Sequence, residues 1–344
     1  MLTRKRSDRM NQLLWMAVGA GAVLSIEGLY WLYWRYVGSG SVRDYINEDQ
    51  EPEGDYRILR KIKTPNQRIA LVEYRGQMWI YGNGDVMFST TEDENMYAEA
   101  MVHIPMAAAG KRNKVLIIGG GGGVTTREAL RYSEVEEITA VDVDDVMLEF
   151  GKHLEAMVRF NRGSLNHPKV RTVIEDGRTF IENTPMKWDV IVIDVPEPTG
   201  RYPRLSRLFS VEFYRLLKER LEPEGAINIA CSTSFWMPEY FWSIQETLKK
   251  AGFQVLPFHH FVPEDGEDWA FCLATTSPVD TDGLRMLVST EYLTPERLKD
   301  MFYMPFYFAN GQNQGDIQTD DNTVLLDIVS EADYEQDGNR KEYN

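Results

Sequence analysis

The chain has few cysteines and a deficit of basic residues. Its two cysteines, Cys231 and Cys272, are too few for a disulfide framework and lack the spacing of a metal site, so we expect both to pack in the core and predict no bound metal. The 37 basic residues against 53 acidic ones give a net charge of -16. General nucleic-acid binding is excluded, because it requires a basic surface that neutralises phosphates.

Apolar residues are plentiful. Hydrophobic side chains make up 43% of the 344 residues. A chain of this length and composition can bury a sizeable core. We therefore expect one large domain or two unequal ones rather than a disordered protein.

The longest apolar run covers residues 13–36 and has about the length that crosses a bilayer. Basic residues precede it and tryptophans and tyrosines lie in its last turns, which is typical of a membrane-spanning helix. We predict that residues 1–37 form a membrane anchor, in a bacterial inner-membrane protein that crosses once and has a cytoplasmic catalytic domain. Glu27 interrupts the run and would suit a membrane-protein partner. A secretory signal peptide is the alternative, and the basic N-terminus itself favours the opposite orientation.

The rest of the chain divides by pattern. Residues 38–55 are polar and acidic and are predicted to be a linker, and residues 331–344 a flexible tail. Short alternating segments within residues 56–105 predict a small antiparallel β-domain. Residues 106–330 alternate apolar strands with helices, which indicates parallel βαβ units and an α/β fold of Rossmann-like type.

A glycine turn follows the first of these strands. The strand VLII leads into five glycines beginning with Gly119, Gly120, Gly121 and Gly122, and a helix-forming segment comes next. Glycines at this place let the backbone approach a ligand closely. Asp142 ends the next strand, about twenty residues further on, where a carboxylate accepts hydrogen bonds from ribose hydroxyls. Together these features predict a nucleoside-binding site.

Two further aspartates end strands. Asp176, followed by Gly177, would accept a hydrogen bond from an adenine amino group or cap the helix that begins there, and the sequence leaves both interpretations open. Asp194 ends the strand WDVIVID and would lie at the edge of the sheet beside the ligand. A buried carboxylate there can take the proton of an amine that attacks a carbon next to a sulfonium. Alignment and deprotonation suffice for such a transfer.

The order VLIIGGG, EITAVDVD, VIEDGRTF and WDVIVIDVPEP resembles the spermidine synthase, or polyamine aminopropyltransferase, family. The resemblance extends from about Tyr56 to Val329, and the late YLTPERL and NTVLLD resemble the membrane-associated bacterial branch. It implies a seven-stranded methyltransferase-type sheet and a homodimer or higher oligomer. It also implies decarboxylated S-adenosylmethionine as cosubstrate, with no permanently bound cofactor, and a small amine as acceptor. The implied roles are nucleoside contact for Gln67, Asp142 and Asp176, acid–base catalysis for Asp194, and lining of the amine tunnel for Tyr97.

The sequence departs from the family where the amines should bind. The family turn GGGDGG holds the aminopropyl ammonium with its aspartate, and Gly122 stands at that position. Ala98 replaces the usual His or Gln before Glu99. The family segment DSSDP is here DVPEP, so Glu197 replaces the second aspartate. The following loop carries a basic cluster that does not suit a polyamine: Arg201, Arg204 and Arg207.

Three functions are therefore compatible with the sequence. The first is aminopropyl transfer to a di- or polyamine, with Asp194, Glu197 and Tyr97 as the catalytic set. The second is transfer of an aminocarboxypropyl or methyl group from S-adenosylmethionine itself, which Gly122 and the arginines favour. The third is a non-catalytic subunit that senses a nucleoside or polyamine in a membrane complex.

Overall fold

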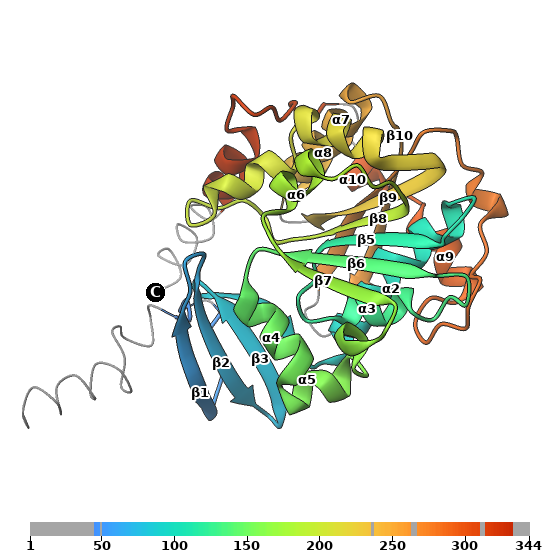
Figure 1. Ribbon diagram of the computed structural model, residues 1–344. Coiled ribbons are helices and arrows are strands. Elements are labelled where there is room, and N and C mark those ends of the chain that lie inside the picture. The colour runs from blue at the N-terminus through green and yellow to red at the C-terminus, as the bar shows by residue number, and fades with distance from the viewer. Residues whose placement is uncertain (1–44, 49, 235–236, 263–266, 310–313, 333–344) are drawn as a thin grey trace, which may run out of the picture.

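The structure is a computed structural model that describes residues 45–48, 50–234, 237–262, 267–309 and 314–332. Within these ranges the chain forms two β-sheets, with helices packed against both faces of the larger one (Figure 1). The predicted anchor, residues 1–37, and nearly all of the predicted tail lie outside the described residues.

The smaller sheet confirms the strands expected from the short alternating segments. It is antiparallel, in the order β1-β2-β3-β4. The strands are β1 (Tyr56–Lys63), β2 (Arg68–Tyr74), β3 (Gln77–Gly82) and β4 (Asp85–Ser89). Successive residues of β2 point to opposite faces, so Ile69 and Leu71 enter one apolar cluster while Ala70 and Val72 enter another. Both faces are therefore covered, which explains why β2 is apolar throughout its middle.

The larger sheet has the seven strands that the resemblance implied, in the order β10-β11-β9-β8-β5-β6-β7. Strands β7, β6, β5, β8 and β9 run parallel, while β11 is antiparallel to both of its neighbours. The strands are β5 (Lys114–Gly119), β6 (Glu137–Asp142), β7 (Val170–Ile174), β8 (Trp188–Asp194), β9 (Leu221–Thr233), β10 (Gln254–Val262) and β11 (Glu267–Thr275). Cys231 and Cys272 are buried in this sheet, as predicted.

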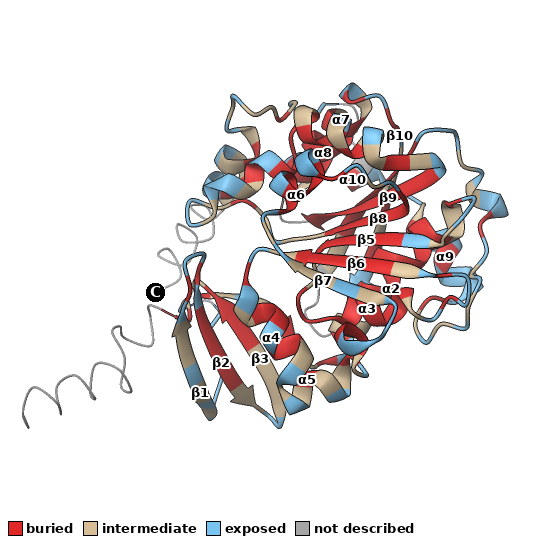
Figure 2. Cartoon of the chain, viewed as in Figure 1, coloured by how far each residue is buried: buried red, intermediate tan, exposed pale blue. Residues whose placement is uncertain are grey.

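Helices cover the larger sheet on both sides (Figure 2). One apolar layer includes side chains of α6, α7 and α8, and the other includes side chains of α2, α3 and α9. The helices are α2 (Glu92–Ala108), α3 (Val124–Ala129), α4 (Asp145–His153), α5 (Glu155–Phe160), α6 (Gly177–Asn183), α7 (Val211–Arg220), α8 (Pro238–Lys250), α9 (Pro295–Met301) and α10 (Phe306–Ala309). Helix α2 packs on α3 and β9, so it joins the α/β layer although the sequence grouped it with the β-domain.

None of the helices in the described ranges is long and apolar enough to cross a membrane. This finding contradicts the predicted location as a single-pass protein of a bacterial inner membrane, and that prediction is withdrawn. The prediction came from the composition of residues 13–36, which lie outside the described part of the chain.

The topology brings three predicted residues to one edge of the sheet. Strands β5, β6 and β8 are parallel neighbours, so their carboxyl ends lie together. Gly119 pairs in register with Asp194, and Asp142 ends the strand on the other side of β5. Ligands bind at such a crevice in open α/β sheets.

Candidate active site

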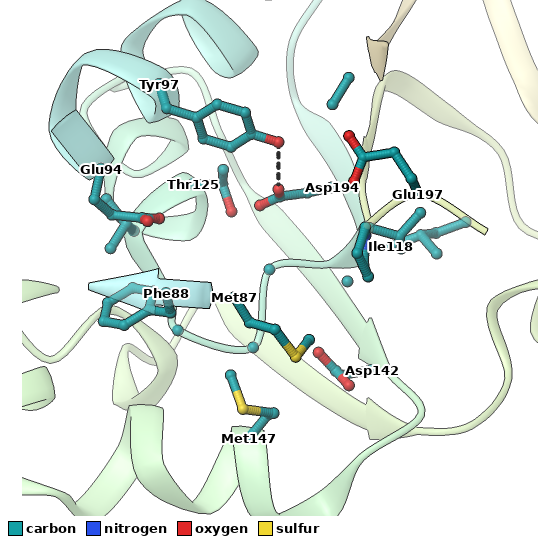
Figure 3. Close-up of a pocket in the computed structure, with 18 of the residues that line it drawn as sticks. Met87, Phe88, Glu94, Tyr97, Ile118, Thr125, Asp142, Met147, Asp194 and Glu197 are labelled. Atoms are coloured by element: carbon teal, nitrogen blue, oxygen red, sulfur yellow. Dashed lines mark hydrogen bonds between the residues drawn. The ribbon is translucent and has the colours of Figure 1, made fainter. Parts of the chain in front are cut away.

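A cavity of about 310 Å³ lies between the carboxyl ends of these strands and the smaller sheet (Figure 3). The smaller sheet contributes Trp79 and Phe88, and the turn between its strands β1 and β2 contributes Gln67. The larger sheet contributes the glycine turn, Asp142 and Asp194. All eleven predicted site residues line this one cavity: Gln67, Tyr97, Gly119, Gly120, Gly121, Gly122, Asp142, Asp176, Gly177, Asp194 and Glu197.

Asp194 is held by a tyrosine from another element. The Tyr97 hydroxyl, on α2, donates a hydrogen bond of 2.9 Å to Asp194 Oδ1 (Figure 3). Burial raises the pKa of Asp194, and the hydroxyls of Tyr97 and Thr125 act in the opposite direction. A carboxylate whose pKa is raised by burial is a stronger base than an exposed one, which suits proton removal from an amine.

Glycine is required in this turn because its backbone passes close to the carboxylates of Asp142 and Asp194. Gly120 has φ +64°, and a Cβ there would lie 2.7 Å from Asp194 Oδ2. At Gly121 a Cβ would lie 2.6 Å from Asp142 Oδ2. A side chain at Gly120 would therefore collide with the Asp194 carboxylate, and one at Gly121 with the Asp142 carboxylate.

Asp142 lies at the end of β6 and lines the cavity, and its contact with a ribose stays a prediction. Its Oδ1 accepts a hydrogen bond of 2.9 Å from the backbone N–H of Asp144. Burial raises the pKa of Asp142 to about 7, and the backbone hydrogen bonds from Asp144 and Gly121 only partly oppose this rise. The carboxyl therefore titrates near neutral pH.

Asp176 fits both interpretations that the sequence left open. Its Oδ1 accepts a 2.9 Å hydrogen bond from the backbone N–H of Thr179, so it caps α6. The same residue lines the cavity together with Gly177. The helix cap is confirmed, and contact with an adenine stays a prediction.

Gln67 is buried and both ends of its amide are engaged. Nε2 donates to Asp144 Oδ2 at 2.9 Å, and Oε1 accepts from the hydroxyl of Tyr202 at 3.0 Å. Tyr202 belongs to the segment that follows β8 and also lines the cavity. This hydrogen bond thus joins the segment after Asp194 to the β1–β2 turn of the smaller sheet.

The arginine cluster lies outside the cavity lining. None of Arg201, Arg204 and Arg207 lines the cavity. Arg201 donates to the backbone carbonyl of Asn83 and lies 3.7 Å from a carboxylate oxygen of Asp85. The arginines, which in the sequence favoured S-adenosylmethionine itself as the donor, therefore offer no cation to a ligand in the cavity, and Arg201 contacts the β3–β4 turn.

The charged side chains that line the cavity, among the described residues, are all acidic. Its lining contains no Lys, Arg or His among the residues that the structure describes. Six carboxylates line it: Asp93, Glu94, Asp142, Asp176, Asp194 and Glu197. Such a concentration of negative charge between low-dielectric walls attracts cations.

Several lining residues had no role in the sequence analysis. Glu94 and Asp93 were visible in the segment DENMY, and Thr125 directly follows the glycine turn and Val124. Tyr202 lies in the sequence between two of the arginines. Nothing in the local pattern marks these four residues, because their roles depend on which elements the fold brings together.

Phe88 occupies the space next to Gly122. A Cβ at Gly122 would lie 2.5 Å from Phe88 Cε2 and 2.6 Å from Cδ2. The Phe88 ring is 4% exposed and packs edge-on against Phe160. An aspartate at position 122 is therefore excluded unless this ring moves.

A second carboxylate cluster lies outside the cavity. Glu99, His103 and Glu128 are buried, and their ligand-type atoms lie within 4.8 Å of one another, as in a metal site. The cluster is instead neutralised by protein groups: Arg131 lies 2.6 Å from Glu128 and 3.6 Å from Glu99. Glu99 also accepts backbone hydrogen bonds from residues 291–293. We assign this cluster to holding the C-terminal segment against α2.

Comparison with known proteins agrees with the fold and the cavity. Residues 94–282 match the family described as the spermine/spermidine synthase domain. Polyamine aminopropyltransferase 2 of Bacillus cereus is 30% identical over 286 residues, which are 83% of this chain and 77% of that protein. Polyamine aminopropyltransferase 2 of Aquifex aeolicus is 33% identical over 258 residues, covering 75% of this chain and 51% of that protein. Polyamine aminopropyltransferase 2 of Ralstonia nicotianae is 32% identical over 71% of this chain and 46% of that protein.

Solved structures of spermidine synthases share the fold. One, a complex with the transition-state analogue AdoDATO, has a TM-score of 0.65 and 25% identity, and covers 74% of this chain and 87% of that one. Spermidine synthase from Thermotoga maritima has a TM-score of 0.63 and 24% identity, over 74% of this chain and 86% of that one.

The sheet order and the cavity at its carboxyl edge define an α/β protein of the methyltransferase-type class. Within that class the chain belongs to the spermine/spermidine synthase family. It spans about half the length of several curated relatives that it matches.

Proposed function

We propose that this chain transfers an aminopropyl group from decarboxylated S-adenosylmethionine to a di- or polyamine. The observation that carries the proposal is Asp194, in a cavity lined by carboxylates, with Tyr97 hydrogen-bonded to it. Asp194 takes a proton from the acceptor amine, and the nitrogen lone pair forms a bond to the aminopropyl carbon attached to the sulfonium. The carbon–sulfur bond breaks and neutral methylthioadenosine leaves.

The charge of the cavity favours the decarboxylated donor. This donor carries a sulfonium and an ammonium and no carboxylate, so every charged group on it is attracted by the six lining carboxylates. S-adenosylmethionine adds a carboxylate, which would meet no cationic side chain among the described lining residues. A buried charge without a partner is costly, so the aminocarboxypropyl and methyl alternatives are disfavoured.

We assign the remaining residues by their places along the cavity. Asp142 accepts from the ribose hydroxyls, and Asp176 accepts from the adenine amino group. The glycine turn allows the donor to lie against the backbone. Glu197, which follows Asp194 by three residues, attracts the acceptor amine, and Tyr97 orients Asp194. The six carboxylates and the hydrogen bond between Tyr97 and Asp194 support these assignments.

The deciding experiment is a binding and product assay with the full chain. Isothermal titration would compare decarboxylated S-adenosylmethionine, S-adenosylmethionine and methylthioadenosine, and mass spectrometry would follow addition of putrescine or spermidine. We expect tighter binding of the decarboxylated donor and a product heavier by one aminopropyl unit. Preference for the carboxylated donor would favour another transferase, and binding without any product would favour the sensing subunit.

This assay does not test two predictions from the sequence, the oligomeric state and the division into domains. The homodimer or higher oligomer, implied by the resemblance, stays a prediction that light scattering of the purified chain would test. The division into a small β-domain and a larger catalytic domain is likewise a proposal. The separate sheets support it, although α2 packs on the larger one.

A further inference from the structure

Three departures from the family pattern meet around one aromatic ring. Phe88 belongs to an apolar cluster that also contains Ala98 and Val124, and its ring stands where a Cβ of Gly122 would be. The family pattern has His or Gln at the first of these positions, and the turn GGGDGG has glycine and aspartate at the other two. The polar side chains that would line this corner are thus replaced together by a packed apolar group.

The replacement removes one carboxylate, but the donor ammonium still requires a negative charge beside it. A decarboxylated donor still carries an ammonium at the end of its propyl chain, and an ammonium that leaves water requires a counter-charge. Position 122 cannot supply it, because a Cβ there would be only 2.5 Å from the Phe88 ring. Asp142 and Asp176 lie at the ends of β6 and β7, on the nucleoside side, and Asp194 and Glu197 serve the transfer and the acceptor. Of the six lining carboxylates, Asp93 and Glu94 therefore remain as candidates for this counter-charge.

Glu94 is the better placed of the two. Asp93 is buried, at 8% exposure, whereas Glu94 is half-buried in the first turn of α2, three residues before Tyr97. Residues three apart share a helix face, so Glu94 and Tyr97 are presented to the same cavity. Figure 3 shows the Glu94 carboxylate directed into the cavity between the Tyr97 and Phe88 rings. Its charge also acts on the Tyr97 hydroxyl.

We propose that Glu94 binds the aminopropyl ammonium of the donor, in place of the turn carboxylate that Gly122 and Phe88 exclude. This assignment rests on the proposed function, because it presupposes a donor with an ammonium. The binding point is thereby moved from the glycine turn to the first turn of α2. Glu94 then selects the donor, while Asp194 performs the proton transfer.

The test compares two ligands that differ in this ammonium. The variant Glu94→Gln removes the charge and conserves the shape, so binding of decarboxylated S-adenosylmethionine should weaken roughly 10- to 100-fold. Binding of methylthioadenosine, which lacks the aminopropyl group, should stay within about twofold. Glu92→Gln is the matched control, because Glu92 is exposed on the same helical turn and does not line the cavity.

A second variant tests the role of Phe88. Adding Phe88→Ala and Gly122→Asp to Glu94→Gln opens the corner and restores a carboxylate on the turn, so donor binding should recover at least tenfold while methylthioadenosine binding is unchanged. A gain for both ligands would indicate general repacking and would count against the assignment.

The outcomes separate this inference from the proposed function. If the unmodified chain binds and uses the decarboxylated donor but Glu94→Gln binds it equally well, the inference is overturned and the function stands. If the unmodified chain prefers S-adenosylmethionine to the decarboxylated donor, or makes no product from it, the proposed function fails first.

Discussion

Helix α2 presents carboxylates to two regions of opposite electrical character. Glu94 lines a cavity whose described lining has no cationic side chain, and Tyr97, on the same helix, holds Asp194 there. Two residues further on, Glu99 enters a cluster with Arg131 and Glu128. In the cavity, burial raises the pKa of Asp142 and Asp194. In the cluster, burial also acts to raise the pKa of Glu128, but hydrogen bonds from His103 and Arg131 lower it to about 2.

The comparison separates carboxylates that stabilise the fold from those that bind or react. A buried carboxylate neutralised by arginine and backbone N–H groups has little left to offer a ligand. A buried carboxylate without a cation stays costly until a cationic ligand arrives, and groups with such raised pKa values concentrate at functional sites. Removing a side chain from each region should therefore have opposite consequences for activity and for stability.

The largest expected effect is on catalysis, from Asp194→Asn. The amide conserves shape but cannot accept the amine proton, so kcat should fall by roughly 10²- to 10⁴-fold. Methylthioadenosine binding should change by less than about twofold. Steady-state kinetics and titration with this nucleoside measure the two quantities, and undiminished turnover would remove Asp194 from the mechanism.

The next effect is on stability, from Glu128→Gln. Removing the charge leaves the buried Arg127 without its carboxylate partner and leaves Arg131, whose side chain is 30% exposed, with Glu99 alone, so the free energy of unfolding should fall by roughly 3 kcal/mol while nucleoside binding is retained. Urea denaturation measures this loss. Glu134→Gln is the control on the surface, where the carboxylate is exposed and lies 3.5 Å from Arg112; its denaturation midpoint should not move. Equal midpoints for the two variants would contradict the structural role of Glu128.

The same cluster predicts how stability depends on pH. Because the pKa of Glu128 is about 2 in the folded chain, below its ordinary value of 4.5, its contribution is complete above about pH 4.5 and is lost as the pH falls toward 2. The difference in stability between the unmodified chain and Glu128→Gln should therefore shrink over this interval. A difference that stays constant from pH 6 to pH 3 would contradict the prediction.

A smaller effect is expected on nucleoside binding as the pH changes. Ribose hydroxyls donate to an ionised Asp142, whose pKa is about 7, so binding favours release of its proton. Affinity for methylthioadenosine should therefore rise up to about tenfold between pH 6 and pH 8 and then level off. Calorimetry across this range measures the change, and Asp142→Asn should abolish the dependence along with much of the affinity.

The smallest effect concerns the segment after Asp194. Tyr202→Phe removes the hydrogen bond to Gln67 and conserves the ring. One neutral hydrogen bond contributes about 1 kcal/mol, so KM for the donor should rise by roughly two- to tenfold with kcat nearly unchanged. Ser133→Ala, at an exposed position remote from the cavity lining, provides a control for handling of the protein.

How much the sequence predicted depends on the kind of pattern. The alternation of strands and helices and the glycine turn predicted the α/β layer, because apolar periodicity and glycine placement are local properties. They also predicted that Asp142, Asp176 and Asp194 lie at one edge, since Asp142 and Asp194 end parallel strands of one sheet and Asp176 follows a third by two residues. The apolar run at the N-terminus led instead to a membrane location that no described helix supports.

The sequence by itself determined which residues end the strands and where the backbone must bend, because both follow from neighbours in the chain. Only the tertiary structure decided which charges meet. It placed Arg201 on the β3–β4 turn instead of the cavity, gave Glu128 two arginines, and set the Phe88 ring against Gly122. Electrostatic interactions and steric exclusion act through space between residues far apart in sequence, so a carboxylate's role depends on the packing around it.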